Sequence, residues 1–185
     1  MKPPLPLFVG RVPSPLGTLL LVCDDDGRLR ALDFESHETR MRRLLRLHYD
    51  DGRIALAARR APAALTAPLE AFFAGDLHAL DVVPVRTGGT AFQRRVWAAL
   101  RRIPAGTVTT YGRLARVLGQ PTACRAVGRA NGANPVGIVV PCHRVIGANG
   151  ALTGYGGGIE RKRWLLDHER RWRTAAEVAA GGASA

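Results

Sequence analysis

A chain of 185 residues with 46% hydrophobic side chains is long enough to bury a core as one ordinary domain or two small ones. No apolar run approaches the roughly 20 residues that span a bilayer, and Met1 to Gly10 lacks the layout of a signal peptide, so we expect a cytoplasmic protein with no membrane partner. Three cysteines without a CxxC pair argue against a disulfide framework and a zinc knuckle.

The net charge of +12 is distributed unevenly along the chain. Residues 1–85 carry 11 Lys/Arg and 11 Asp/Glu, whereas residues 86–185 carry 16 and 4. Between Val82 and Ile159 the sequence has no acidic residue. Such a basic half is typical of a protein that binds a polyanion, and we expect nucleic acid. A general bias toward arginine is the alternative, but it would not neutralise one half and spare the other.

The first half is predicted to be a small α/β domain. Apolar runs at 18–23 and 29–34 flank an Asp-Gly pair, which favours a β-hairpin because glycine tolerates the positive φ of the turn. Apolar residues at helical spacing follow at 41–48 and again at 65–73. The segment 81–89, which contains a proline and a Gly-Gly pair, is the predicted boundary.

Beyond this boundary the pattern is helical. Thr90 and Gln93 form a capping box ahead of an apolar stripe. A second helix, capped by one of the threonines at 109–110, is expected to stop at Gly119, and Thr122 is expected to cap a third. The short turn between these two helices predicts a helix-turn-helix unit with a basic second helix.

The second helix of this unit carries small and basic residues rather than base-reading ones. Arg125 and Arg129 share one face, while Ala126 and Gly128 allow the backbone to approach another surface closely. A helix that reads sequence usually presents Asn, Gln or several Arg to base edges, so we expect sequence-independent binding. The Ala/Gly-rich end of the chain, at 173–185, is expected to be a disordered tail.

Cys142 is the candidate for chemistry. A buried strand at 136–140 is predicted to deliver this thiol into a Pro-Cys-His-Arg turn, where Pro141 can open a helical turn. Only the thiolate is a good nucleophile, and a neighbouring His or Arg lowers the pKa of a thiol. Neighbours on a strand point to opposite faces, so Cys142 and His143 can cooperate only if the chain bends or a water links them. The alternative is a packed core thiol, which is how we interpret Cys23.

Several ordered motifs resemble the O6-alkylguanine-DNA alkyltransferases, also called methylated-DNA-protein-cysteine methyltransferases. The segment NPVGIVVPCHRV at 134–145, followed by GYGGG at 154–158, is similar to the active-site region of that family. The resemblance runs from Thr90 to Glu169 through FQRRVW, TYGRLA, RAVGRANGANP and RKRWLLDHE. SPLG at 14–17 and LEAFFAG at 69–75 match more weakly.

The resemblance implies an α/β N-terminal domain of ribonuclease-H-like topology at 1–85, without that activity. It further implies a mainly α, winged helix-turn-helix domain at 86–172 that binds the DNA minor groove. The implied function is direct-reversal repair of double-stranded DNA, in which the alkyl group of O6-alkylguanine, or of O4-alkylthymine, moves once and permanently to Cys142. No cofactor is implied. Some family members hold zinc, but Cys23 has no convincing partner set, so we expect no metal.

The resemblance also implies roles for individual residues. Cys142 would be the acceptor, and His143 would remove its proton through a water while Glu169 orients His143. Asn134 would hold the active-site turn, and Tyr111 would protonate the departing O6. The DNA-binding and base-flipping set would be Arg125, Thr122, Ala126, Gly128 and Arg129, with Arg125 filling the stack. The pocket for the flipped base would be shaped by Val145, Tyr155, Gly156 and Gly157.

The chemistry is consistent with these roles. Displacing O6 from carbon requires a soft nucleophile and a proton for the oxygen, and the base must leave the duplex at a cost of a few kcal/mol. Glu169 is expected at the end of a helix that starts near Glu160, where a carboxylate opposes the helix dipole and needs a cation. From the residues alone, His143 and the pair Arg170 and Arg171 are equally good partners.

Several expectations remain to be tested. The glycines at 156–158 leave the loop without side chains, so we expect the pocket to accept groups bulkier than methyl. We expect a monomer that can cluster on DNA, located with the nucleoid if the source is a prokaryote. Two alternative functions are a binding-only sensor of alkylated DNA and a hydrolase with a Cys-His-Glu triad.

Overall fold

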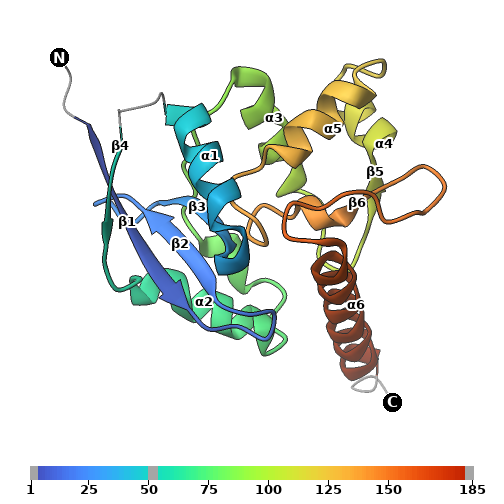
Figure 1. Ribbon diagram of the computed structural model, residues 1–185. Coiled ribbons are helices and arrows are strands. Elements are labelled where there is room, and N and C mark those ends of the chain that lie inside the picture. The colour runs from blue at the N-terminus through green and yellow to red at the C-terminus, as the bar shows by residue number, and fades with distance from the viewer. Residues whose placement is uncertain (1–3, 50–53, 182–185) are drawn as a thin grey trace.

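The computed structural model describes residues 4–49 and 54–181 (Figure 1). Its N-terminal half holds a sheet in the order β3-β2-β1-β4, made of β1 (Leu5–Val12), β2 (Leu19–Cys23), β3 (Leu29–Phe34) and β4 (Ile54–Ala58). Strand β1 runs antiparallel to β2 and parallel to β4, and β2 runs antiparallel to β3. Helix α1 (Glu38–Tyr49) connects β3 to β4, and α2 (Ala63–Phe73) follows. This β-β-β-α-β order confirms the predicted α/β topology.

Both faces of the sheet are covered, which is why β2 and β3 are buried along their whole length. Met41 and Leu45 of α1 pack on one face. On the other face, Leu69 and Phe72 of α2 join a cluster that also contains Leu165 from the C-terminal half. The two predicted domains therefore share one continuous core.

The C-terminal half is mainly helical. Its helices are α3 (Ala91–Leu100), α4 (Tyr111–Val117), α5 (Cys124–Gly132) and α6 (Ile159–Gly181), with a short parallel pair β5 (Thr109–Thr110) and β6 (Val145–Ile146). The described residues also contain the 3-10 turns η1 (Glu35–His37), η2 (Ala79–Val82) and η3 (Cys142–Arg144). No helix within the described ranges is both long and apolar enough to cross a membrane.

Most of the predicted helix starts are confirmed, with one exception. The hairpin turn has Gly27 at φ +72°, and Thr90 and Gln93 form the predicted capping box of α3. Thr110 caps α4. The prediction that Thr122 caps the next helix is wrong, because Ala123 donates its N–H to the Gln120 carbonyl and α5 begins one residue later, without a side-chain cap.

The end of the chain also differs from the prediction. Helix α6 continues to Gly181, so residues 173–181 of the predicted disordered tail are helical, whereas 182–185 lie outside the described residues. The alanines of this segment are the strongest helix formers, and they extend a helix that has already begun. Glu169 consequently lies inside α6 rather than at its end, and the predicted opposition to the helix dipole does not arise.

The free edge of β3 is closed by segments from further along the chain. Leu29 donates to the Pro84 carbonyl at 2.8 Å in the segment that links the two halves. Leu32 donates to the Pro135 carbonyl and accepts from Gly137 N–H, both at 2.9 Å. The segment that leads to Cys142 is therefore hydrogen-bonded to the N-terminal sheet.

Candidate active site

Cys142 lies at the start of η3, after a buried but irregular segment. Val139 N–H donates to the Gly137 carbonyl at 2.7 Å, and Cys142 N–H donates to the Val140 carbonyl at 2.8 Å. Ile138, which lies between Gly137 and Val139, has φ +67°, a left-handed value that is uncommon for a β-branched residue. The prediction of a strand here is therefore wrong: apart from the contacts of Pro135 and Gly137 with Leu32, the segment forms its backbone hydrogen bonds within tight turns.

Asn134 closes this turn from the inside. Its side chain is buried, donates to the Val140 carbonyl at 2.8 Å and accepts from Val136 N–H at 3.0 Å. The two ends of the turn are thus tied to one amide group.

The thiol of Cys142 is nearly enclosed, with 6% of the residue exposed. Burial raises the pKa of Cys142, and the opposing effects of Asn134, Arg40 and Lys162 do not reverse the shift. The resting group is therefore a neutral thiol at neutral pH, and it requires a base before it can act as a nucleophile.

A buried ion network lies behind this thiol. His143 Nε2 and Glu169 Oε1 are 2.8 Å apart, and both side chains are fully buried. Arg144 donates to the same carboxylate through Nε at 3.0 Å and Nη2 at 2.9 Å. Burial raises the pKa of Glu169, but His143 and Arg144 outweigh it and lower the value to about 2. Arg170, which competed with His143 in the sequence, instead pairs with Asp167 at 3.2 Å.

His143 is held in the state that a general base needs. Burial lowers its pKa despite the opposing effect of Glu169, so the imidazole is neutral and the permanent cation of the network is Arg144. A neutral imidazole that donates Nε2–H to Glu169 has its lone pair at Nδ1. This Nδ1 is buried and has no hydrogen-bond partner within the described part of the chain. Cys142 and His143 must therefore communicate through a water or a small movement.

Two further polar side chains tie the surrounding segments together. Tyr111, the first residue of α4, has its hydroxyl 3.0 Å from Thr153 Oγ1. Lys162 of α6 is fully buried and donates to the carbonyls of Val145 at 2.6 Å and Thr153 at 3.0 Å. The sequence reading missed Lys162, although it lies three and seven residues before Leu165 and Glu169, on the buried side of α6.

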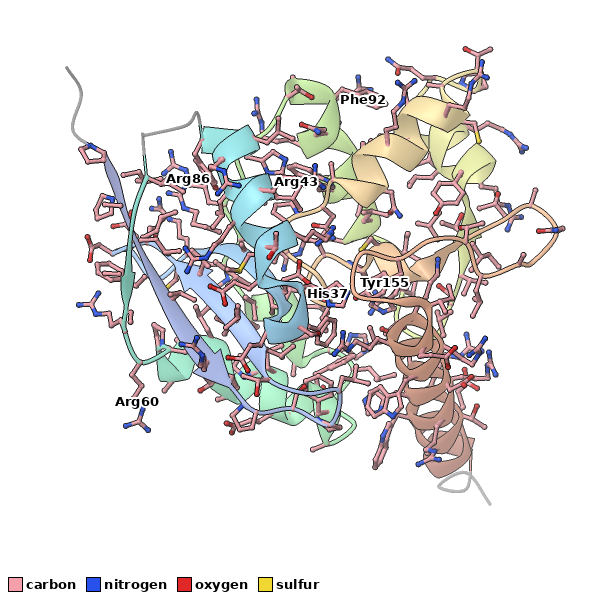
Figure 2. The ribbon with its side chains drawn as sticks, in the orientation of Figure 1. His37, Arg43, Arg60, Arg86, Phe92 and Tyr155 are labelled. Carbon is pink, nitrogen blue, oxygen red and sulfur yellow. The ribbon has the colours of Figure 1, made fainter. Side chains whose placement is uncertain are left out.

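The loop after Thr153 packs against the N-terminal half. Tyr155 lies between α1 and the start of α6 (Figure 2), with its ring edge-on to His143 at 6.4 Å. A Cβ on Gly156 would overlap the Arg40 guanidinium, and one on Gly157 would lie 2.5 Å from Phe34. The void beside Cys142 that these glycines line is about 10 Å³.

These contacts give Gly156 and Gly157 a second role, because Arg40 and Phe34 occupy the space where their side chains would go, whereas a Cβ on Gly158 would meet nothing within 4 Å. That the pocket accepts groups bulkier than methyl stays a prediction. Arg40 itself was not predicted. It pairs with Asp33 at 2.6 Å and donates to the carbonyls of Gly132 and Asn134, which links α1 to the active-site turn.

The predicted DNA-binding residues lie on and just before α5. Arg125 and Arg129 are exposed, as is Thr122 in the preceding turn. Ala126 and Gly128 are half-buried, and a Cβ on Gly128 would lie 3.8 Å from the Tyr111 ring. Helix α5 therefore presents its arginines to solvent while its small residues allow close packing on α4.

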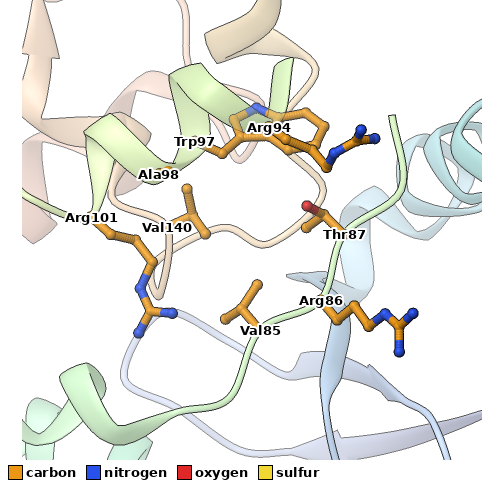
Figure 3. A pocket seen from close by; sticks show the side chains of 8 residues that line it. All are labelled: Val85, Arg86, Thr87, Arg94, Trp97, Ala98, Arg101 and Val140. Carbon is orange, nitrogen blue, oxygen red and sulfur yellow. The ribbon is translucent and has the colours of Figure 1, made fainter. Parts of the chain in front are cut away.

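A larger hollow lies away from these residues, between α3 and the segment that links the two halves (Figure 3). It measures about 320 Å³ and is lined by Val85, Arg86, Thr87, Arg94, Trp97, Ala98, Arg101 and Val140. Arg101 lines the hollow at one end, and its Nη2 donates to the carbonyls of Asp81 in η2 and of Val83 just after it, at 3.1 and 3.2 Å. Among the described residues, no three His, Cys, Asp or Glu side chains cluster as a metal site requires.

Comparisons with known proteins agree with this geometry. The profile of the 6-O-methylguanine DNA methyltransferase ribonuclease-like domain matches residues 7–87, and that of the DNA binding domain matches 91–171. The chain is similar to the methylated-DNA–protein-cysteine methyltransferases of Salmonella typhimurium, with 53% identity over 89% of this chain and 96% of that protein, and of Methanosarcina acetivorans, with 44% identity over 84% and 94%. A crystal structure of Mycobacterium tuberculosis OGT in complex with DNA superimposes with a TM-score of 0.73 at 38% identity, covering 91% of this chain and 94% of that one. The chain therefore belongs to the 6-O-methylguanine DNA methyltransferase family.

Proposed function

We propose that this chain repairs double-stranded DNA by moving the alkyl group of an O6-alkylated guanine to Sγ of its own Cys142. The observation that carries the proposal is the buried thiol of Cys142 beside a neutral His143 whose Nε2–H is held by Glu169. The related proteins named methylated-DNA–protein-cysteine methyltransferases support the choice of alkyl transfer over hydrolysis.

The transfer follows from the states of these groups. Nδ1 of His143 takes the thiol proton through a water, and the thiolate attacks the alkyl carbon. The carbon–O6 bond breaks, its electron pair passes to guanine, and the Tyr111 phenol supplies a proton to the oxygen. The product is a thioether without a carbonyl for water to attack, so one molecule repairs one lesion and needs no cofactor.

DNA binding is assigned to the unit that we propose spans residues 86–172, with residues 1–85 as the second unit. The target atom lies inside the duplex, so the base must be flipped into the pocket formed by Val145 and the Tyr155–Gly157 loop. Arg125 is exposed on α5 and is suited to fill the vacated space. Neighbouring contacts come from Thr122, Ala126, Gly128 and Arg129. We propose the same reaction for O4-alkylthymine, and a monomer that can cluster on DNA in the cytoplasm, at the nucleoid in a prokaryote.

The deciding experiment uses duplex DNA with a radiolabelled methyl group on guanine O6. Wild-type protein is expected to take up one label per chain, located on the Cys142 peptide by mass spectrometry, and Cys142→Ala none. Label on the Ala variant would refute the acceptor assignment. Tight binding of the lesion without label would indicate a sensor, and repeated turnover of an ester would indicate a hydrolase.

A further inference from the structure

We infer that Arg161 is a positioning residue for the lesion base: it fixes the Tyr155–Gly157 loop against the N-terminal domain. This inference rests on the proposed function, because it concerns the pocket in which the flipped base is bound. Arg161 lies in the first turn of α6, directly after the loop.

The guanidinium of Arg161 bridges three separate segments. Nη1 donates to the Gly157 carbonyl at 3.0 Å, which fixes the last residue of the pocket loop. Nε donates to the Leu16 carbonyl at 3.1 Å, and Nη2 donates to Ser36 Oγ at 3.1 Å. The last two partners belong to the N-terminal domain, 145 and 125 residues away in sequence. One side chain therefore holds the loop and the domain in a fixed relation.

Phe34 strengthens this arrangement. The Arg161 guanidinium carbon lies 4.0 Å from the centroid of the Phe34 ring, the geometry of a cation–π contact. The same ring covers Gly157, where an added Cβ would lie 2.5 Å from it. The planar guanidinium thus stacks on the ring while its edge binds the loop, and an ammonium group cannot do both.

The role also explains the SPLG motif, which the alkyl-transfer chemistry leaves without a purpose. Ser14 Oγ accepts from Leu16 N–H at 3.2 Å, and Gly17 N–H donates to the Ser14 carbonyl at 3.1 Å, so residues 14–17 form a tight turn. The Leu16 carbonyl in this turn is the acceptor for Arg161 Nε. The turn at 14–17 therefore serves the pocket loop, and through it the N-terminal domain takes part in holding the base.

The consequence is specific to the pocket wall. Tyr155 packs edge-on to His143, but the His143–Glu169–Arg144 network and the Asn134 turn make no contact that runs through Arg161. Loss of Arg161 should loosen the Tyr155–Gly157 loop and weaken binding of the lesion base. The reactivity of the Cys142 thiol should be preserved.

The test measures single-turnover transfer from the free base O6-benzylguanine, which removes DNA binding from the readout. The variants are Arg161→Ala, Arg161→Lys and the control Arg163→Ala, which removes an exposed arginine of α6 whose partner is Glu160. We expect the half-saturating base concentration to rise about tenfold in Arg161→Ala, since a hydrogen bond to a charged group is lost. Arg161→Lys should reverse only part of this rise in the half-saturating concentration, and Arg163→Ala should match wild type.

Two measurements separate positioning from a general structural defect. In Arg161→Ala the maximal transfer rate and the rate of Cys142 alkylation by iodoacetamide should stay within about twofold of wild type. Amide hydrogen exchange should accelerate in residues 154–158 but not in 134–145. An unchanged half-saturating concentration, or a parallel loss of maximal rate and thiol reactivity, would overturn the inference. Failure of wild type itself to take up the methyl group from O6-methylguanine in duplex DNA would instead overturn the proposed function.

Discussion

His143 and Arg144 are neighbours in sequence, yet both bind the single buried carboxylate of Glu169, at 2.8 Å and 2.9 Å. The arginine carries the permanent charge that the carboxylate requires. His143 can therefore remain neutral and keep its Nδ1 lone pair, as the proposed removal of the Cys142 proton requires. The division of roles depends on the carboxylate, and the first predictions follow from it.

Replacing Glu169 by Gln should reduce both stability and transfer. The change leaves Arg144 as an unpaired buried cation, for which we expect a loss of about 3–5 kcal/mol in the free energy of unfolding. The amide can also offer its NH₂ to His143, which favours the wrong tautomer and slows proton removal. Urea unfolding and single-turnover transfer check both effects. Glu160→Gln, at an exposed pair with Arg163, is the matched control, and equal losses in the two variants would contradict the prediction.

Stability should fall as the pH is lowered through the range in which His143 titrates. Its pKa is lowered in the fold from the ordinary 6.5, so the unfolded chain binds the proton first, and stability present above pH 6.5 is lost below it. Glu169 adds a second loss between its ordinary pKa of 4.5 and its folded value of about 2. His48, whose pKa is also lowered by burial, acts in the same direction as His143.

Unfolding measured from pH 8 to pH 5 tests this. A single group contributes at most about 1.4 kcal/mol per pH unit. His143→Gln should remove part of the slope and leave the part due to His48. A slope that is the same in the variant would show that folding does not change the pKa of His143.

Cys124 and Cys142 differ in solvent exposure and should therefore react with iodoacetamide in a fixed order. Cys124 is exposed, whereas Cys142 is buried and its pKa is raised by that burial. We expect Cys124 to be modified first at neutral pH, and the modification of Cys142 to require higher pH as its thiolate forms. Peptide mass spectrometry at a series of pH values gives both rates. Faster modification of Cys142 at pH 7 would mean that the free protein already holds a thiolate.

Local features of the fold could be predicted because they depend on nearby residues. The Thr90–Gln93 box and the turn at Gly27 are set by side chains within three residues of each other, and both are confirmed. Strands β1 and β4 were not anticipated. Pro6 and Gly10 interrupt the first, and three alanines make the second weakly β-forming. Their pairing comes from the sheet rather than from local preference.

The site divides in the same way. Cys142, His143 and Asn134 lie in one short motif, so the sequence could bring them together. Arg40 reaches Gly132 across 92 residues, and no local pattern reports such a contact. Arg144 belongs to the Pro-Cys-His-Arg motif, but the sequence indicated only that it lies near the thiol. A charged residue within a motif does not reveal which carboxylate it binds. The left-handed Ile138 gave no signal either, since a β-branched residue is a poor choice for that conformation.

Two arginines of α5 should differ in what they do. Arg125→Ala is expected to slow transfer from duplex DNA but leave transfer from free O6-benzylguanine unchanged, because the free base needs no flipping. Arg129→Ala should weaken binding of damaged and undamaged duplex alike. Because one phosphate contact is lost, the slope of log binding constant against log salt concentration should fall by about one in magnitude. Binding isotherms at several salt concentrations and single-turnover rates distinguish them. Identical behaviour of the two variants would remove the assignment of Arg125 as the wedge.

The glycine loop allows a matched comparison within a few residues. Gly157→Ala places a Cβ 2.5 Å from Phe34, whereas a Cβ at Gly154 meets nothing within 4 Å. Overpacking of this kind costs about 1–3 kcal/mol, so Gly157→Ala should lower the free energy of unfolding and weaken binding of the lesion base, while Gly154→Ala should do neither. If the glycines served only to make room for large alkyl groups, Gly157→Ala would reject the benzyl group but transfer methyl at the normal rate. Because Phe34 and Arg161 hold this loop from the side of the N-terminal domain, we expect methyl and benzyl transfer to fall together, and rates measured with both adducts in the same duplex decide between the two explanations.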